Sequence, residues 1–112
     1  MDLFVNSPPA SLLRIVNQVF EMEKKILRNE DASLTRNIAR IKSALEEMGL
    51  VYENPEGESY DETRTDCEAS ISGDKTENLI ITEAIKPIIR LNVNGFSQIV
   101  QRGVVVVEST IL

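Results

Sequence analysis

The sequence predicts an α+β fold, in which an N-terminal helical hairpin is followed by a small, mostly antiparallel β head. Apolar residues up to Met48 recur at alternating three- and four-residue steps, which is the spacing of amphipathic helices. Beyond Leu50, turn residues separate short β-branched runs that are typical of strands. The charge changes at the same boundary: residues 1–48 hold seven basic and seven acidic residues, whereas residues 49–112 hold five and eleven. The second segment thus carries the whole net charge of -6, and we expect a helical dimerisation region at 1–49 and an acidic β head domain at 50–112.

The first helix is predicted to begin at Ser7-Pro8, with serine as the N-cap and proline at the first helical position. Its apolar stripe consists of Leu12, Ile15, Val19, Met22 and Ile26. The segment Asn29-Glu30-Asp31 interrupts this pattern, and either Asn29 or Asp31 can cap the next helix.

The second helix carries the stripe Leu34, Ile38, Ile41, Leu45 and Met48 and is predicted to end at Gly49. Glycine at this place can adopt the left-handed conformation of a Schellman motif, with Leu50 folded back on the last turn. Two interpretations fit the stripes: they pack on the chain's own sheet, or part of them forms a dimer interface. Because two such helices present more apolar surface than one small sheet covers, we favour dimerisation. The expected interface is Leu12, Ile15, Val19, Met22, Ile26, Leu34, Ile38, Ile41 and Leu45.

The β half is predicted to contain five strands joined mostly by hairpins, as a small antiparallel sheet or partial barrel. They are Cys67–Ser72, Leu79–Ala84, Ile88–Val93, Phe96–Gln101 and Val104–Glu108. Asn94-Gly95 is the strongest hairpin signal, because both residues tolerate the positive φ of a type I′ turn. The uninterrupted valines from Val104 to Val107 predict a strand buried on both faces.

The composition excludes several classes of function. The chain has no histidine and one cysteine, so it can supply neither a four-ligand zinc site nor a Ser-His or Cys-His catalytic pair. Eighteen acidic residues against twelve basic ones argue against nucleic-acid binding. The apolar run Leu3–Val5 is too short for a signal peptide, and Asp2 is acidic where a signal peptide carries basic residues. No apolar run approaches the length that a membrane span needs. We therefore expect a cytoplasmic protein with no membrane or nucleic-acid partner, no cofactor and no enzymatic activity.

Three interpretations remain open for the acidic residues between Glu53 and Glu68. They form a solvated loop, a docking surface for a basic partner patch, or, least favoured, an acid-base or metal-dependent hydrolytic site. Cys67 alternates with Ala69 and Ile71 in a predicted strand, which favours a buried thiol over a reactive one.

From about Leu34 to Glu108 the order of motifs resembles the GrpE family, the nucleotide-exchange co-chaperones of DnaK-type chaperones. The matching segments are Met48-Gly49-Leu50, Pro55-Glu56-Gly57-Glu58, Tyr60-Asp61, Glu68-Ala69, Ile81-Thr82-Glu83-Ala84-Ile85-Lys86, Arg90-Leu91-Asn92, Asn94-Gly95 and Ile99 to Val107. The sequence departs from the family in its short first helix, in Cys67 where histidine is usual, and in Phe96 where a basic contact residue is typical.

The resemblance implies a homodimer whose helices pair and whose β head docks onto the ATPase domain of a DnaK-type chaperone, so that ADP leaves faster. The docking positions that carry over are Ile85, Lys86, Asn94 and Gly95, with Phe96 as an altered position. The departures leave an alternative open, in which the GrpE-like head is a protein-binding or oligomerisation module without exchange activity.

Overall fold

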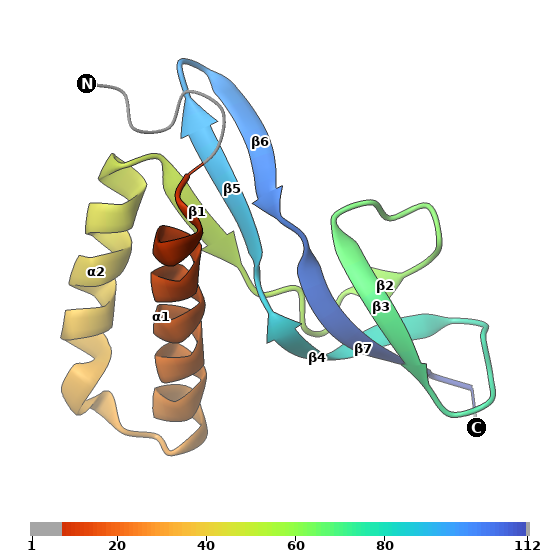
Figure 1. Ribbon diagram of the computed structural model, residues 1–112. Coiled ribbons are helices and arrows are strands. Elements are labelled where there is room, and N and C mark those ends of the chain that lie inside the picture. Colours follow the sequence, from red (N-terminus) through yellow and green to blue (C-terminus); the bar gives the residue numbers. More distant parts are fainter. Residues whose placement is uncertain (1–7, 112) are drawn as a thin grey trace. The chain divides into compact units, whose positions relative to one another are not determined.

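The computed structural model describes residues 8–111 and confirms the α+β class, with two helices preceding the strands (Figure 1). Helix α1 spans Ala10–Arg28, a short 3₁₀ helix η1 spans Ala32–Leu34, and helix α2 spans Thr35–Glu47. The strands that follow are β1 (Leu50–Glu53), β2 (Ser59–Tyr60), β3 (Cys67–Ser72), β4 (Leu79–Lys86), β5 (Ile88–Val93), β6 (Phe96–Gln101) and β7 (Gly103–Ser109).

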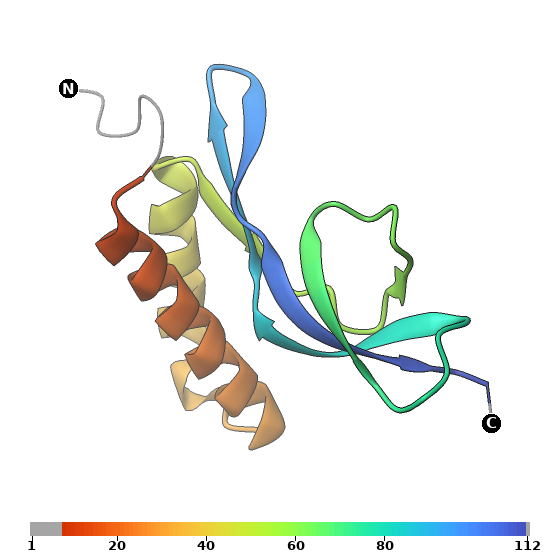
Figure 2. The same cartoon turned by 45° about the vertical axis from the view of Figure 1, so that its right-hand side comes forward.

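The strands form two sheets, one in the order β1-β5-β6 and one in the order β2-β4-β7-β3. The chain also divides into two compact units. Unit 1 is the chain up to Tyr52 together with Arg90–Val100, and unit 2 is Glu53–Ile89 together with the chain from Gln101 onward. Unit 1 therefore combines both helices with most of β1 and with the hairpin that joins β5 to β6, which is visible in both views (Figures 1 and 2).

Helix α1 begins later than the sequence predicts. Its first residue is Ala10 and Pro9 is its N-cap, so Pro8 does not occupy the first helical position. Ser7 and the run Leu3–Val5 lie outside the described residues. Of the two predicted caps, Asn29 and Asp31, it is Asp31 that caps the next helix, η1. Its carboxylate accepts a hydrogen bond from the Ser33 N–H at 2.9 Å.

The predicted left-handed end of α2 is confirmed at Gly49, whose φ is 88°. Its N–H donates to the Glu46 carbonyl at 2.9 Å, which is one of the two hydrogen bonds of a Schellman motif. The chain then passes directly into β1 at Leu50.

The core of unit 1 lies between the helices and the strands of the same unit. Phe20 packs edge-to-face on Tyr52 of β1, with ring centroids 6.0 Å apart. The fully or largely buried apolar side chains of this core are Val16, Val19, Phe20, Ile38, Leu45, Leu50 and Leu91.

Unit 2 contains the four-stranded sheet. Across both units, the strands β3, β5 and β6 have the predicted bounds. Strand β4 continues two residues further than predicted, to Lys86, and β7 is longer by one residue at each end. The strands β1 and β2 were not predicted. Antiparallel pairs join β2 to β4 and β4 to β7, whereas β3 and β7 pair in parallel from Cys67↔Gly103 to Ser72↔Glu108. The buried apolar side chains of unit 2 are Cys67, Leu79, Ile81, Ala84, Ile88, Ile89, Val105 and Val107.

The prediction that the valine strand is buried on both faces is wrong. Val105 and Val107 are buried, while Val104 and Val106 are only half-buried. Because successive side chains of a strand point to opposite faces, the valines place one face of β7 in the core and leave the other partly open. Among the described helices, neither α1 nor α2 has the length and apolar character needed to cross a membrane.

Candidate protein-binding surfaces

The first candidate surface is the tip of the hairpin between β5 and β6, in unit 1 (Figure 1). Asn94 and Gly95 have φ values of 53° and 81°, which confirms the predicted type I′ geometry. Phe96 follows directly and is 79% exposed, so its side chain is not a core residue.

The second candidate surface is the end of β4, in unit 2. The pairing of β4 with β7 shifts between Ala84↔Val105 and Lys86↔Val104, so Ile85 is the extra residue of a β-bulge. The bulge turns this isoleucine out of the alternation, and the side chain is 50% exposed. Pro87, which has no N–H, follows at once, and its carbonyl accepts a hydrogen bond from the Gln101 side chain at 3.0 Å.

The structure separates the nine expected interface residues of the helices into three groups. Val19, Ile38 and Leu45 are buried within the chain, and Leu12, Ile26 and Ile41 are half-buried. Ile15, Met22 and Leu34 are exposed, Ile15 by 54%. Met48, the last residue of the α2 stripe, is exposed as well. The stripes therefore supply part of the core of unit 1 and still leave apolar side chains at its surface.

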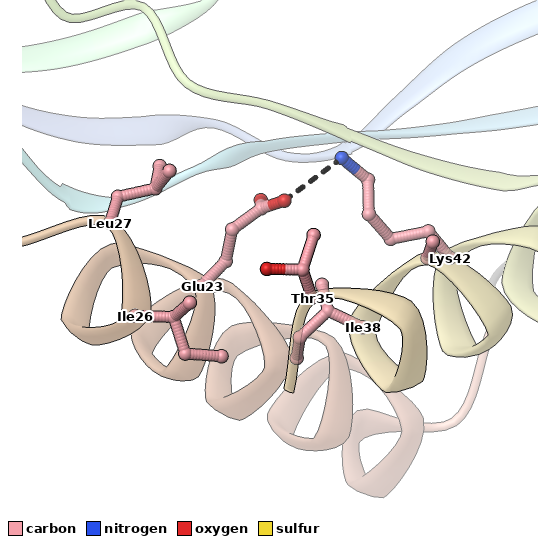
Figure 3. Close-up of a pocket in the computed structure, with 7 residues that line it drawn as sticks. Glu23, Ile26, Leu27, Thr35, Ile38 and Lys42 are labelled. Atoms are coloured by element: carbon pink, nitrogen blue, oxygen red, sulfur yellow. Dashed lines mark hydrogen bonds and ion pairs between the residues drawn. The ribbon is translucent and has the colours of Figure 1, made fainter. Parts of the chain in front are cut away.

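A groove of about 270 Å³ lies between α1 and α2 (Figure 3). Its lining is largely apolar and consists of Glu23, Ile26, Leu27, Thr35, Ile38, Ala39 and Lys42. Glu23 and Lys42 point toward one another from the two helices, and the Lys42 Nζ lies 3.2 Å from a Glu23 carboxylate oxygen.

Tyr52 of β1 joins this ion pair. Its hydroxyl donates a hydrogen bond to Glu23 Oε1 at 2.8 Å, and the Lys42 Nζ lies 5.0 Å from the centre of its ring. Partial burial of the phenol, together with the hydrogen bond to Glu23 and the negative charge of Glu23, raises the pKa of Tyr52 above its usual range. These contacts tie both helices to β1. Sequence reasoning missed them because the three residues are distant along the chain.

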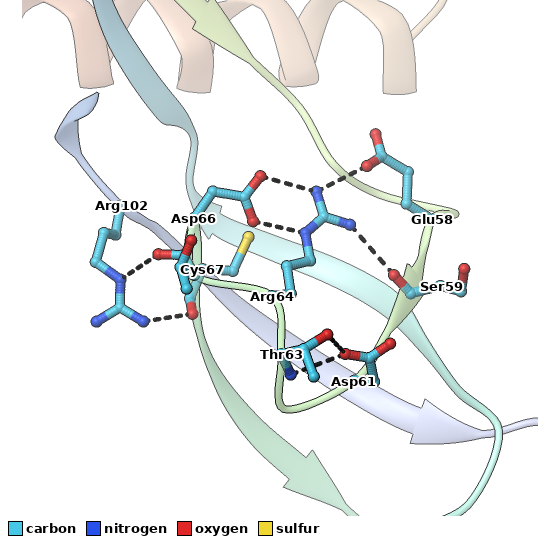
Figure 4. Close-up of polar contacts among 9 residues, drawn as sticks. Glu58, Ser59, Asp61, Thr63, Arg64, Asp66, Cys67 and Arg102 are labelled. Carbon is cyan, nitrogen blue, oxygen red and sulfur yellow. Dashed lines mark hydrogen bonds and ion pairs between the residues drawn. The ribbon is translucent and has the colours of Figure 1, made fainter. Parts of the chain in front are cut away.

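The acidic loop is organised around Arg64 (Figure 4). Its Nε donates to Asp66 Oδ1 at 2.6 Å, its Nη2 donates to Glu58 Oε1 at 2.8 Å, and its Nη1 donates to the Ser59 carbonyl at 3.2 Å. The guanidinium holds the pKa of the Asp66 carboxyl below its usual range. Arg64 is the single basic residue between Glu53 and Glu68, and this position was the signal in the sequence for the cluster.

Arg102 forms a second cluster at the start of β3. Its guanidinium donates to the Cys67 carbonyl at 2.7 Å and to the Thr65 carbonyl at 3.1 Å, and it also pairs with the Glu68 carboxylate at 3.2 Å. The Cys67 thiol is buried, as expected, and burial is the main cause that raises its pKa.

Several carboxylates of the acidic run therefore have structural roles. Asp61 caps a turn by accepting hydrogen bonds from the N–H and hydroxyl of Thr63, and Glu56 accepts one from the Ala84 N–H at 3.0 Å. Within residues 8–111 no three His, Cys, Asp or Glu side chains gather closely enough to hold a metal ion. These hydrogen bonds give part of the acidic run a role in holding the loop together. The excess negative charge of the run remains at the surface.

No protein-family model matches the chain, and neither a curated protein nor a solved structure is significantly similar to it. The resemblance to the GrpE family therefore depends on the sequence motifs alone.

Proposed function

We propose that the chain is a GrpE-like co-chaperone, which binds the ATPase domain of a DnaK-type chaperone and promotes the release of ADP. The observation that carries the proposal is the exposure of all five docking positions, Ile85, Lys86, Asn94, Gly95 and Phe96. Two of them are large apolar side chains, Ile85 with 50% and Phe96 with 79% of its surface exposed. Aromatic side chains such as that of Phe96 supply much of the energy in protein interfaces.

The proposed mechanism is differential binding. The factor binds the chaperone more tightly when the nucleotide cleft is open, and it therefore shifts the population of the chaperone toward the open state. A tenfold increase in the rate of ADP release corresponds to a decrease of about 1.4 kcal/mol in the activation free energy of release. The proposal requires no catalytic residue or cofactor from this chain.

The test is the rate of release of a fluorescent ADP analogue from a DnaK-type chaperone, measured by stopped flow. We expect the wild-type chain to accelerate release, and we expect Phe96→Ala and Ile85→Ala each to need about tenfold more protein for the same effect. Leu27→Ala and Ile111→Ala are the matched controls, because they remove exposed aliphatic side chains of the same two units outside the docking positions. Absence of both acceleration and complex formation would refute the proposal.

Homodimerisation through the helices is part of the proposal. The exposed Ile15, Met22 and Leu34 supply apolar surface for it. The charge distribution favours the same face, since residues 1–48 carry seven basic and seven acidic residues, whereas the rest of the chain is strongly acidic. Pairing through the helices brings the two neutral segments together and keeps the acidic segments out of the interface.

A cytoplasmic location also belongs to the proposal, because the one cysteine is a buried thiol that suits a reducing compartment. No nucleic-acid or membrane partner is proposed.

A second candidate function is a GrpE-like protein-binding or oligomerisation module without exchange activity. Two observations favour it: α1 has only 19 residues, where the family has a much longer helix, and Phe96 stands where a basic contact residue is typical. Affinity capture from the native cell extract separates the two functions. Recovery of partners that lack a DnaK-type ATPase domain, together with unchanged ADP release, would favour the module.

A further inference from the structure

The outer edge of β3 is a second type of surface, built from main-chain groups. β3 is the last strand in the order β2-β4-β7-β3, and its six residues pair in parallel with β7. The Gly103 N–H donates to the Asp66 carbonyl at 2.9 Å. In a parallel pair, every second residue of a strand directs its N–H and C=O to the same neighbour. The polar main-chain groups of Glu68, Ser70 and Ser72 therefore face β7, and those of Cys67, Ala69 and Ile71 face the other side.

The beginning of this edge is already covered. The Arg102 guanidinium donates to the Cys67 carbonyl at 2.7 Å, as Figure 4 shows. Beyond it, no strand of the part of the chain that the structure describes pairs with the outer side of β3. Ser70, Ile71 and Ser72 are exposed, Ile71 by 46%. The N–H and C=O groups of Ala69 and Ile71 thus form a short template for one more strand.

The two faces of β3 differ in chemistry. The side chains of Glu68, Ser70 and Ser72 lie on one face and are polar and exposed, and those of Ala69 and Ile71 lie on the other. A strand added at this edge would place its own side chains alternately beside these two faces. Aliphatic residues would be stabilised next to Ile71, whereas Glu68 is already paired with Arg102.

The charge of unit 2 decides which occupant fits. Unit 2 contains four basic and eleven acidic residues. A second copy of this unit, paired edge to edge, would bring two strongly negative surfaces together. A cationic segment would be attracted by the same field, and its approach would be accelerated.

We propose that the outer edge of β3 binds an extended segment of a partner protein, in which basic and aliphatic residues alternate, by adding it to the sheet as a further strand. Main-chain hydrogen bonds to Ala69 and Ile71 supply affinity, and the negative field and Ile71 supply selectivity. The site uses none of the five docking positions of the proposed exchange activity, so it stands or falls independently of that activity.

The first test is calorimetric titration of the full chain with three synthetic peptides of equal length. The probes are Lys-Val-Lys-Val-Lys-Val-Lys, its counterpart with Glu in place of Lys, and Lys-Val-Lys-Pro-Lys-Val-Lys, which keeps the charge and loses a central N–H. We expect binding of the first, no binding of the second, and about tenfold weaker binding of the third, because a main-chain hydrogen bond is lost. Equal binding of the two lysine peptides would mean attraction by charge alone and would overturn the proposal.

The second test changes the edge itself. Ile71→Pro removes the outward N–H and leaves the pairing with β7 in place, as proline on an edge strand allows, while Ile71→Val keeps both the N–H and an aliphatic side chain. We expect about tenfold weaker binding of the first peptide to Ile71→Pro and nearly unchanged binding to Ile71→Val. If Ile71→Pro does not fold, hydrogen exchange of the wild-type chain decides: slower exchange of the Ala69 and Ile71 amides on binding supports the proposal, and unchanged exchange overturns it. Loss of self-association in Ile71→Pro with unchanged peptide binding would assign the edge to a second copy and would also overturn it.

Discussion

Gly49 and Asn92 approach each other too closely for any side chain to lie between them. The Asn92 N–H donates to the Gly49 carbonyl at 2.7 Å, and a Cβ atom placed on Gly49 would lie 2.6 Å from the Asn92 carbonyl oxygen. Gly49 also has a φ of 88°, which disfavours other residues. The glycine that ends α2 is therefore also the point where the chain after the helix meets the end of β5.

Gly49→Ala is expected to lower the free energy of unfolding by about 2–4 kcal/mol. The left-handed φ contributes about 1 kcal/mol of this loss, and the overlap with the Asn92 carbonyl contributes the remainder. Gly57→Ala is the matched control, since Gly57 has a φ of 89° and a Cβ atom placed on it would meet nothing within 4 Å. It is expected to lose only about 1 kcal/mol. Urea denaturation of both variants measures the difference, and equal losses would show that the contact with Asn92 is not tight.

Arg64→Gln is expected to destabilise the chain by about 1–2 kcal/mol at pH 7, because it leaves Asp66 and Glu58 without their guanidinium partner. The folded-state pKa of Asp66 lies below its ordinary value of 3.8. The ion pair therefore adds stability above about pH 4, and this contribution is lost as the pH falls through the folded-state pKa. Urea denaturation at pH 7 and pH 3 tests this expectation: the difference between wild type and variant should shrink in acid. Glu62→Gln, in the same loop, controls for a change of one charge, and an Arg64 effect that is independent of pH would contradict the assignment.

The sequence allowed the helices and the longer strands to be predicted because their signals are local. Apolar residues at alternating four- and three-residue steps marked α2, and Asn94-Gly95 marked the hairpin. The four-residue strand β1 and the two-residue strand β2 were missed, since runs so short carry no readable alternation. The parallel pairing of β3 with β7 could not be predicted either, because it joins segments that no local turn connects.

The candidate surfaces divide in the same way. Ile85 was a docking position by resemblance, but its exposure follows from a bulge that depends on the register between β4 and β7. The hydrogen bond of Tyr52 to Glu23 joins residues 29 positions apart, and residue spacing gives no signal for it. The outer edge of β3 became apparent only once its partner strand was known.

Ile15→Glu and Met22→Glu are expected to weaken self-association by at least about tenfold. The two residues are seven positions apart and so lie within about 20° of each other on the helix surface. A charge at either position would have to be desolvated in a paired interface. Sedimentation velocity over a range of concentrations measures the effect, and Ser43→Glu, an exposed polar position of α2, is the control for added charge. A wild-type chain that stays monomeric throughout that range would remove the helical dimer from the proposal.

Tyr52→Phe is expected to change the response of the chain to alkaline pH. The folded-state pKa of Tyr52 lies above its ordinary value of 10.0, so above about pH 10 the unfolded chain releases the phenolic proton before the folded chain does. The free energy of unfolding of the wild type should therefore fall as the pH rises from 9 to 11, and in Tyr52→Phe this part of the fall should be absent. At pH 7 the variant should be less stable by about 1 kcal/mol, since the hydrogen bond to Glu23 is lost.

Thermal unfolding at a series of pH values checks the Tyr52 prediction. Tyr60→Phe leaves the bond between Tyr52 and Glu23 in place and should keep the pH dependence that this bond produces. Glu23→Gln should lessen the pH dependence without removing the phenol, because it takes away the negative charge that opposes ionisation of Tyr52. If wild type and Tyr52→Phe lose stability in parallel, the phenol does not meet Glu23, and another contact must hold the helices to β1.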